Sequence, residues 1–211
     1  MVKVILKKDY LKFLGTAGAR FVMIKQLRAS GGLWISSNGV KILVDPGPGS
    51  IVRCAESNPK IDPSSLDGII LTHKHLDHAN DINVMIEAMT EGGFKKRGVV
   101  FCPSDALGKD PVILGYARKL PGKIVLLKPR HSYRVKGFSF STSMQHKHAA
   151  KTYGIKFKLG GKRVAVLADT RYFEELEKFY KADILVISVV FMEPRKGIDH
   201  LSLPDVERLL R

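Results

Sequence analysis

The chain has 211 residues, of which 45% are hydrophobic and 26% are charged. This balance is ordinary for a soluble globular protein and excludes a largely disordered or low-complexity chain. Nothing in the sequence marks a break between two cores, so we predict a single domain over residues 1–211.

The net charge is +15, because 35 Lys and Arg stand against 20 Asp and Glu. Such an excess favours an anionic partner, such as RNA, DNA, a nucleotide or a phosphorylated metabolite. Abundant surface charge also suits a protein from a hot environment, where it serves stability. The charge alone leaves both interpretations open.

Two further features bear on the compartment. Charge interrupts residues 1–9 too early for a signal-peptide core, and no later apolar run is long enough to cross a bilayer. We therefore expect a cytoplasmic protein without membrane contact.

Cys54 and Cys102 lie far apart and in no paired metal-binding spacing, so we predict buried, reduced thiols.

Apolar, β-rich runs bounded by Gly, Pro, Asn or charged residues predict strands along the whole chain. In the first half these runs are Phe21 to Ile24, Leu33 to Ser36, Lys41 to Val44, Gly68 to Leu71 and Val99 to Cys102. In the second half they are Ile124 to Leu127, Phe138 to Ser143, Tyr153 to Leu159, Arg163 to Leu167 and Ile184 to Val189. Helical spacing of apolar residues predicts helices over Ile82 to Met89, Tyr172 to Tyr180 and Leu203 to Leu210. We expect an α+β fold of two mostly antiparallel sheets packed face to face, with helices outside and a site in the loops at one edge.

Residues 72–78 read Thr-His-Lys-His-Leu-Asp-His and directly follow an apolar run. His73 and His75 alternate, so they leave an extended segment on the same side, whereas Asp77 and His78 need a bend to face a second ion. Imidazole and carboxylate ligands together suit zinc, iron or manganese, and the cluster has no thiolate to narrow the choice. Without a metal each of these groups would need its own partner, so we predict a site for two ions.

Three more polar residues stand at the ends of later runs: His148, Asp169 and His200. Taken singly, each has an ordinary explanation as a turn aspartate or a solvated histidine. Their order after Asp45 and residues 72–78, however, resembles the metallo-β-lactamase superfamily, and this resemblance implies its four-layer αββα sandwich.

Within that superfamily, the chain resembles the branch of ribonuclease Z and the cyclic-phosphate phosphodiesterases. The resemblance rests on residues 13–18, 45–49 and 148–154. The chain departs from ribonuclease Z because it has no long insertion for a transfer-RNA-binding arm and lacks the His-Glu-Ala-Thr stretch of that enzyme.

The resemblance also implies two divalent metal ions, with zinc favoured over manganese or iron, and a shared water that becomes the attacking hydroxide. One ion takes His73, His75 and His148, the other takes Asp77, His78 and His200, and Asp169 bridges them. Asp45 is expected to orient a ligand histidine from outside the metal shell. A homodimer is possible by analogy with the branch.

Residues 145–148, Gln-His-Lys-His, offer two imidazoles at one strand exit. We favour His148 as the ligand because of its distance to Gly154. We then interpret His146, or the basic residues around it, as the proton donor to the leaving group; the alternative is that His146 is a surface histidine.

Three functions remain open on these residues. The first is a metal-dependent phosphodiesterase acting on RNA ends, cyclic nucleotides or small cyclic phosphates, and the branch resemblance and the basic charge favour it. The second is a lactone or thioester hydrolase with the same site; a true β-lactamase is disfavoured because that subgroup usually has a cysteine where Asp169 stands. The third is a non-catalytic nucleic-acid-binding protein.

Overall fold

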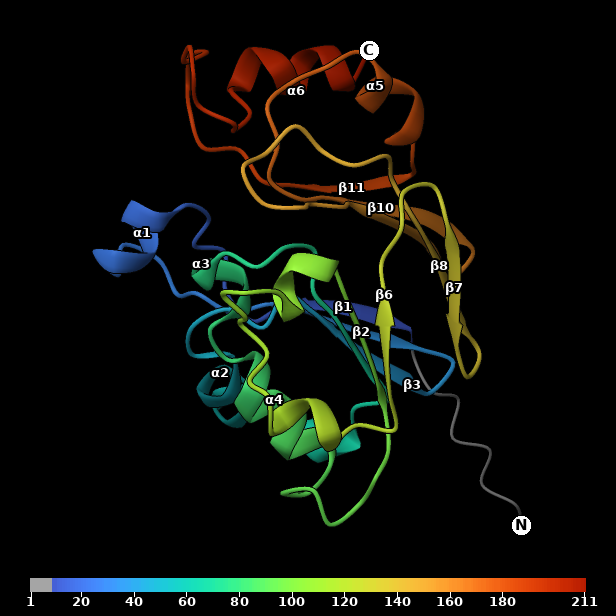
Figure 1. Ribbon diagram of the computed structural model, residues 1–211. Coiled ribbons are helices and arrows are strands. Elements are labelled where there is room, and N and C mark those ends of the chain that lie inside the picture. Colours follow the sequence, from blue (N-terminus) through green and yellow to red (C-terminus); the bar gives the residue numbers. More distant parts are fainter. Residues whose placement is uncertain (1–8) are drawn as a thin grey trace.

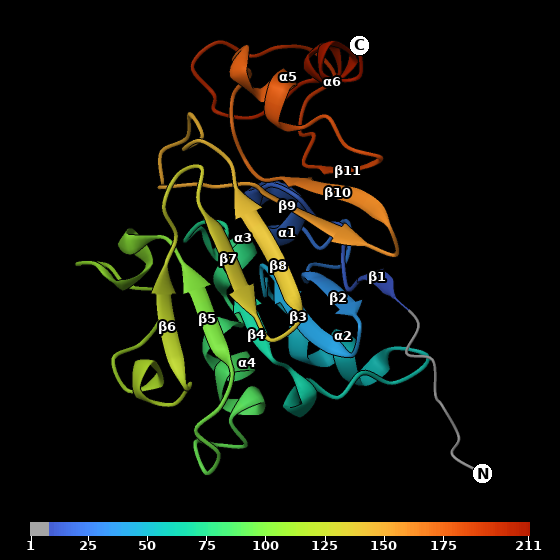
Figure 2. The same ribbon diagram turned by 90° about the vertical axis from the view of Figure 1, so that its right-hand side faces the viewer.

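The computed structural model describes residues 9–211, so the segment in which a signal peptide was sought lies almost wholly outside the described residues. Two β-sheets pack face to face, and helices cover the outer face of each sheet (Figures 1 and 2). The expected αββα layering is confirmed.

The first sheet contains six strands in chain order. Their bounds are β1 Tyr10–Phe13, β2 Leu33–Ser37, β3 Val40–Val44, β4 Gly68–Ile70, β5 Val99–Cys102 and β6 Lys123–Leu126. The strands from β1 to β3 pair antiparallel, whereas those from β3 to β6 pair parallel. The prediction of a mostly antiparallel sheet is therefore wrong here. Helical connections after β3, β4 and β5 return the chain to the same end of the sheet, and this makes the next strand parallel.

The second sheet contains five strands in the order β11-β10-β9-β8-β7. Their bounds are β7 Ser132–Val135, β8 Phe138–Thr142, β9 Ile155–Leu159, β10 Lys162–Leu167 and β11 Ile184–Ile187. All pairings are antiparallel except that of β10 with β11, so the prediction holds for this sheet. Strand β9 buries Ile155, Phe157 and Leu159 and turns its lysines outward, as its alternation predicts.

The helices are short, and none in the described part of the chain is long and apolar enough to span a membrane. Their bounds are α1 Arg20–Ile24, α2 Ser50–Glu56, α3 Leu76–Ala79, α4 Ile82–Met89, α5 Glu175–Phe179 and α6 Leu203–Leu209, with 3-10 turns η1 Pro63–Ser65, η2 Ser104–Leu107 and η3 Ala117–Lys119. The strand predicted over Phe21 to Ile24 is wrong, because these residues form one helical turn. Phe21 and Ile24 stay 72% and 61% exposed, so their apolar character does not mark a core strand.

Three apolar clusters fill the three interfaces between the four layers. The first joins α2 and α4 to the first sheet through residues such as Leu43 and Met85. The second lies between the sheets and includes Ile42 and Phe157. The third joins α5 and α6 to β10 and β11. Cys54 and Cys102 lie in the first cluster as buried free thiols, as predicted.

Candidate metal centre

The predicted site residues all lie in segments that leave strands or precede a helix at one edge of the two sheets. Asp45 follows β3, and residues 72–78 run from the end of β4 into α3. Because β3 and β4 are parallel, their carboxyl ends meet at the same edge. Asp169 leaves β10 of the other sheet. Gly47 makes the close approach of the first two loops possible, since a Cβ there would collide with the backbone carbonyl of Asp77.

The structure brings most of the predicted ligands into overlapping groups. Within each group every residue offers one donor atom, and these atoms lie within 4.8 Å of one another. The groups are His73 with His75, His148 and Asp169; Asp77 with His78 and Asp169; and Asp45 with His73 and His78. Asp169, the residue predicted to bridge two ions, therefore belongs to two of these groups.

A hydrogen-bond chain fixes which nitrogen two of the histidines turn toward the cluster. The Thr72 hydroxyl donates to Asp45 Oδ2 over 2.7 Å, so its oxygen accepts the Nδ1 proton of His73 over 3.0 Å. Asp45 Oδ2 also accepts from His78 Nδ1 over 2.9 Å. Both rings then turn Nε2 toward the cluster, and this nitrogen lies 3.7 Å from Asp169 Oδ2 for His73 and 3.6 Å for His78. Asp45 thus orients two histidines, one directly and one through Thr72.

His148 is held in the same manner by a backbone carbonyl. Its Nδ1 donates to the carbonyl oxygen of Asp199 over 3.1 Å, and its Nε2 lies 3.1 Å from Nδ1 of His75. His75 therefore turns Nδ1 toward the cluster, whereas His73 and His78 turn Nε2 toward it. Sequence spacing gave no sign of Thr72 or of the Asp199 carbonyl as supports.

The electrostatics of the cluster keep three of its histidines neutral. Burial lowers the pKa of His73 well below its ordinary value, and burial and neighbouring imidazoles lower the pKa of His75 and His148. Burial also acts to lower the pKa of His78, but the charge of Asp169 and hydrogen bonds to carboxylates raise it well above the ordinary value. Burial opposes ionisation of Asp169, yet the surrounding histidines, His78 foremost, hold its pKa well below the usual range.

The donor set fits divalent metal ions. His73 Nε2 and Asp169 Oδ1 are buried, and neither has a hydrogen-bond partner among the described residues. A buried polar atom without a partner is costly, and a cation is a partner that both atoms accept. The lowered pKa values of His73, His75, His148 and Asp169 favour neutral imidazoles beside an ionised carboxylate, the form in which these side chains bind metal, whereas His78 would release a proton to join them. We therefore assign these residues as the candidate metal centre.

His200 lies at the margin of this centre. Its Nδ1 is 3.6 Å from Asp169 Oδ2, and its ring centroid is 5.5 Å from that of His148. It does not join any of the compact donor groups among the described residues. The structure thus places His200 beside Asp169, but outside the compact group that contains Asp77 and His78.

His146 differs from both interpretations of the sequence. It is 3% exposed and so is not a surface histidine. Its Nδ1 faces the backbone carbonyl of Asp169 at 3.1 Å, and its Nε2 faces the hydroxyl of Tyr180 at 2.7 Å. Burial lowers its pKa to about 4. Both ring nitrogens are already engaged, so the expectation that His146 protonates a leaving group is corrected: it supports the segment that carries Asp169.

A cavity of about 430 Å³ opens beside His75 and Asp77. Its wall includes the cations Arg20 and Lys74, the acids Asp77 and Asp110, and apolar side chains of α1 and α3. The sequence analysis did not single out Arg20, because its place at the site depends on how the segment before β2 folds over the metal centre. Lys74 lies within residues 72–78 but was not interpreted there as a cavity residue.

Known proteins identify the class to which this fold and site belong. A family model described as the beta-lactamase superfamily domain matches residues 40–211, and the chain belongs to that superfamily, a family of hydrolases. The resemblance inferred from the order of the motifs is confirmed.

One relative and two solved structures illustrate the similarity. The uncharacterized protein MJ1374 of Methanocaldococcus jannaschii is 31% identical over 206 residues, which cover 94% of this chain and 76% of that protein. The metallo-beta-lactamase fold protein YhfI of Bacillus subtilis superposes with a TM-score of 0.76 at 19% identity, over 95% of this chain and 80% of that chain. Human tRNase Z, short form, superposes with a TM-score of 0.67 at 16% identity, over 94% of this chain and 86% of that chain. At these identities the two solved structures share the fold.

Proposed function

We propose that the protein is a metal-dependent phosphodiesterase that acts on an RNA end, a cyclic nucleotide or a small cyclic phosphate. The observation that carries this proposal is the placement of Arg20 and Lys74 in the wall of the cavity beside His75 and Asp77. A phosphodiester is anionic before it reacts and gathers more charge as it reacts, so nearby cations stabilise both states. A neutral lactone or thioester has no such need in its ground state.

The ligand roles in this proposal follow the donor groups, with His200 added because its Nδ1 lies 3.6 Å from Asp169 Oδ2. His73, His75 and His148 would hold one divalent ion, and Asp77, His78 and His200 would hold the other, with Asp169 between them. Such ions, when bound, supply Lewis acidity and lower the pKa of water toward about 7. The imidazole-rich donor set favours zinc over calcium or magnesium, and manganese and iron are its nearest competitors.

The residues around the ligands would prepare the site. Asp45 keeps His73 and His78 in the tautomer that leaves Nε2 free, through the contacts to Thr72 and to His78 itself. The carboxylate of Asp169, only 2% exposed, would offset part of the repulsion between two cations. Arg20 and Lys74 would bind and orient the phosphoryl oxygens.

Human tRNase Z shares this fold, and this supports phosphodiester chemistry on such a scaffold. The cavity volume of about 430 Å³ suits a substrate portion the size of a nucleotide. The net charge of +15 agrees with an anionic substrate.

The test is a substrate panel assayed with zinc and with manganese. It contains bis(p-nitrophenyl) phosphate, nucleoside 2′,3′-cyclic phosphates, single-stranded RNA, a lactone and a thioester. We expect turnover of phosphodiesters, with kcat/KM lowered about tenfold or more by Arg20→Ala and by Lys74→Ala. The exposed Lys96 provides the matched control, Lys96→Ala, which should leave the rate unchanged. Cleavage of the lactone or thioester that exceeds phosphodiester cleavage, and that both variants leave unchanged, would transfer the assignment to a carbonyl hydrolase.

A further inference from the structure

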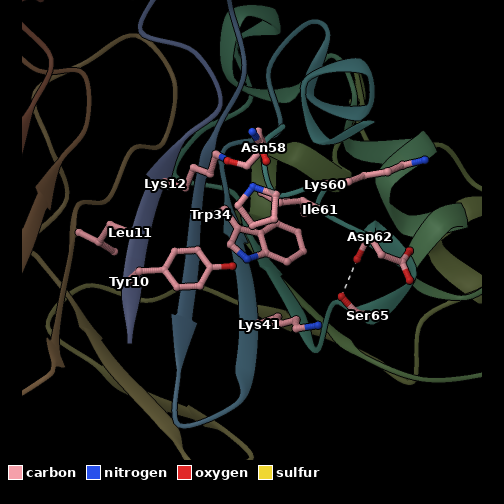
Figure 3. Close-up of a pocket in the computed structure, with 11 residues that line it drawn as sticks. Tyr10, Leu11, Lys12, Trp34, Lys41, Asn58, Lys60, Ile61, Asp62 and Ser65 are labelled. Carbon is pink, nitrogen blue, oxygen red and sulfur yellow. Dashed lines mark hydrogen bonds between the residues drawn. The ribbon is translucent and has the colours of Figure 1, made fainter. Parts of the chain in front are cut away.

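A second cavity, of about 530 Å³, lies away from the metal centre on the helix-facing side of the first sheet (Figure 3). It adjoins the beginning of β3 at Lys41, whereas Asp45 follows the other end of that strand. The lining residues are Tyr10, Leu11, Lys12, Trp34, Lys41, Asn58, Pro59, Lys60, Ile61, Asp62 and Ser65. None of them belongs to the metal centre.

Strand register explains how the cavity arises. Lys12 on β1 lies opposite Trp34 on β2, and Tyr10, two residues earlier on β1, shares its face of the sheet. Lys41 on β3 shares that face with Leu43, which lies opposite Trp34. Helices α2 and α4 pack farther along the sheet, so residues 58–65 form the facing wall. The Lys12 ammonium donates to the Asn58 carbonyl over 3.0 Å and ties this wall to the strand.

The cavity combines an excess of positive charge with apolar walls. Lys12, Lys41 and Lys60 line it, and within residues 9–211 none of the three forms a salt bridge. The one lining acid, Asp62, already accepts hydrogen bonds from the backbone N–H and the hydroxyl of Ser64, at 2.9 and 2.8 Å. The Ser64 hydrogen bonds and, less strongly, the charges of Lys41 and Lys60 lower the pKa of Asp62. Three ammonium groups against this one carboxylate still leave an excess of positive charge for a bound anion.

Trp34 adds a donor that lacks an acceptor. The side chain is 1% exposed, and its Nε1–H has no hydrogen-bond partner among the described residues. Figure 3 shows the indole between Tyr10 and the segment that carries Ile61, with its nitrogen on the edge of the ring nearer Tyr10. Tyr10 is 38% exposed and can adjust to admit a ligand atom. An indole N–H only donates, so the partner that it lacks is an acceptor atom.

We propose that this cavity binds one nucleotide unit, with the base against Tyr10, Trp34 and Ile61 and the phosphate near the ammonium groups of Lys41 and Lys60. A base supplies a flat face for Tyr10 and ring acceptors for the indole N–H, and a phosphate pairs with ammonium groups. Inorganic phosphate would leave the apolar walls uncovered, and an uncharged aromatic ligand would leave the lysines unpaired. The volume lies within the range of small-molecule sites. The unit is either a free mononucleotide or one residue of an RNA strand.

The experiment uses the native reporter of the cavity, because Trp34 is the only tryptophan in the chain. Its fluorescence is titrated with the four nucleoside 5′-monophosphates, a short single-stranded RNA of mixed sequence, the free nucleosides and inorganic phosphate. Equilibrium dialysis with the same compounds detects binding that leaves the fluorescence unchanged. We expect saturable binding of a mononucleotide or of the RNA, weakened about tenfold by Lys41→Ala and by Lys60→Ala and unchanged by Lys96→Ala.

Each outcome decides the proposal. Binding of mononucleotides identifies a free nucleotide as the source, binding of RNA alone identifies a strand, and either result supports the site. The absence of saturable binding by both methods overturns it. An affinity that both lysine variants leave unchanged also overturns it. Equal affinity for inorganic phosphate or for the nucleosides does so as well. Lys60 is exposed, so Lys60→Ala should fold as the parent does. It should also keep the parental rate of bis(p-nitrophenyl) phosphate hydrolysis; a parallel loss of that rate would contradict a cavity separate from the metal centre.

Discussion

The hydroxyl of Thr72 donates to Oδ2 of Asp45 over 2.7 Å, and this contact links two histidines of the candidate metal centre. The same carboxylate oxygen accepts the Nδ1 proton of His78, and the Thr72 oxygen accepts that of His73. Asp45 also takes the Thr72 backbone N–H over 2.7 Å on Oδ1. One carboxylate outside the ligand set thus fixes the ring orientation of two ligands, one on each predicted ion.

Asp45→Asn should weaken metal binding about ten- to a hundredfold. The neutral amide oxygen accepts hydrogen bonds more weakly than the carboxylate oxygen that now accepts from both His78 and Thr72, so both histidines would be held less firmly. Zinc affinity measured by competition with a chromophoric chelator checks this. Asp67→Asn is the matched control: Asp67 is also buried and ion-paired, with Lys136 at 2.6 Å, but lies outside the metal centre. The control should lose stability and keep its zinc affinity. Equal zinc affinities of Asp45→Asn and the parent would contradict the orienting role.

His148→Ala and His146→Ala should separate the two neighbouring imidazoles. His148→Ala removes a donor of the first group and should cost the protein one of its two ions. His146→Ala should keep the metal stoichiometry and lower the free energy of unfolding by about 1–3 kcal/mol, because it leaves the Tyr180 hydroxyl and the Asp169 carbonyl without partners. Elemental analysis and urea unfolding measure the two effects, and the exposed His131 provides the neutral control, His131→Ala. The reverse pattern would exchange the roles of His146 and His148.

Gly154→Ala should destabilise the protein by more than about 2 kcal/mol, because the new methyl group would collide with the hydroxyl of Tyr180 that holds His146. Tyr180→Phe removes that hydroxyl, so the double variant should recover part of the loss. Unfolding free energies of the parent, both single variants and the double variant form a thermodynamic cycle. Strictly additive losses would show that the two residues do not compete for the same space.

The buried thiol of Cys54 should make the free energy of unfolding fall at alkaline pH. Burial and the charge of Asp81 raise the pKa of the Cys54 thiol from 9.0 to about 11. Above pH 9 the unfolded chain releases this proton and the folded chain keeps it, so the unfolded state binds fewer protons and stability falls as the pH rises toward 11. Relative to Cys54→Ala, which lacks the titrating group, the parent should lose up to about 3 kcal/mol across this window. Parallel stability curves for the two proteins would contradict a thiol buried in the core.

Much of the site could be predicted from the sequence because its ligands follow strands whose apolar runs are easy to recognise. Residues 72–78, His148 and Asp169 are brought together as their positions after these runs indicate. The strand direction could not be read in the same way, since a buried apolar run such as β4 looks alike in parallel and antiparallel sheets. Strands β1 and β7 were missed because each has only four residues, and these combine polar with apolar side chains.

The remaining errors arise where distant contacts decide the outcome. Residues Phe21 to Ile24 have a strand-like composition, yet none of them is buried and they form a helical turn. The distance to Gly154 favoured His148 over His146 as the ligand, but local spacing could not show the role of His146, because that role depends on Tyr180, 34 residues away. The cavity around Trp34 likewise depends on strand register and on a loop that closes over the sheet.

The central claim is that the cluster around Asp169 binds two divalent metal ions. Elemental analysis of protein purified without chelator or affinity metal tests it most directly, with Asp169→Asn prepared in parallel. The account predicts two transition-metal ions per chain in the parent and a clear deficit in the variant, because Asp169 belongs to two of the donor groups. A parent that contains no transition metal, and binds none when zinc or manganese is supplied, would contradict it.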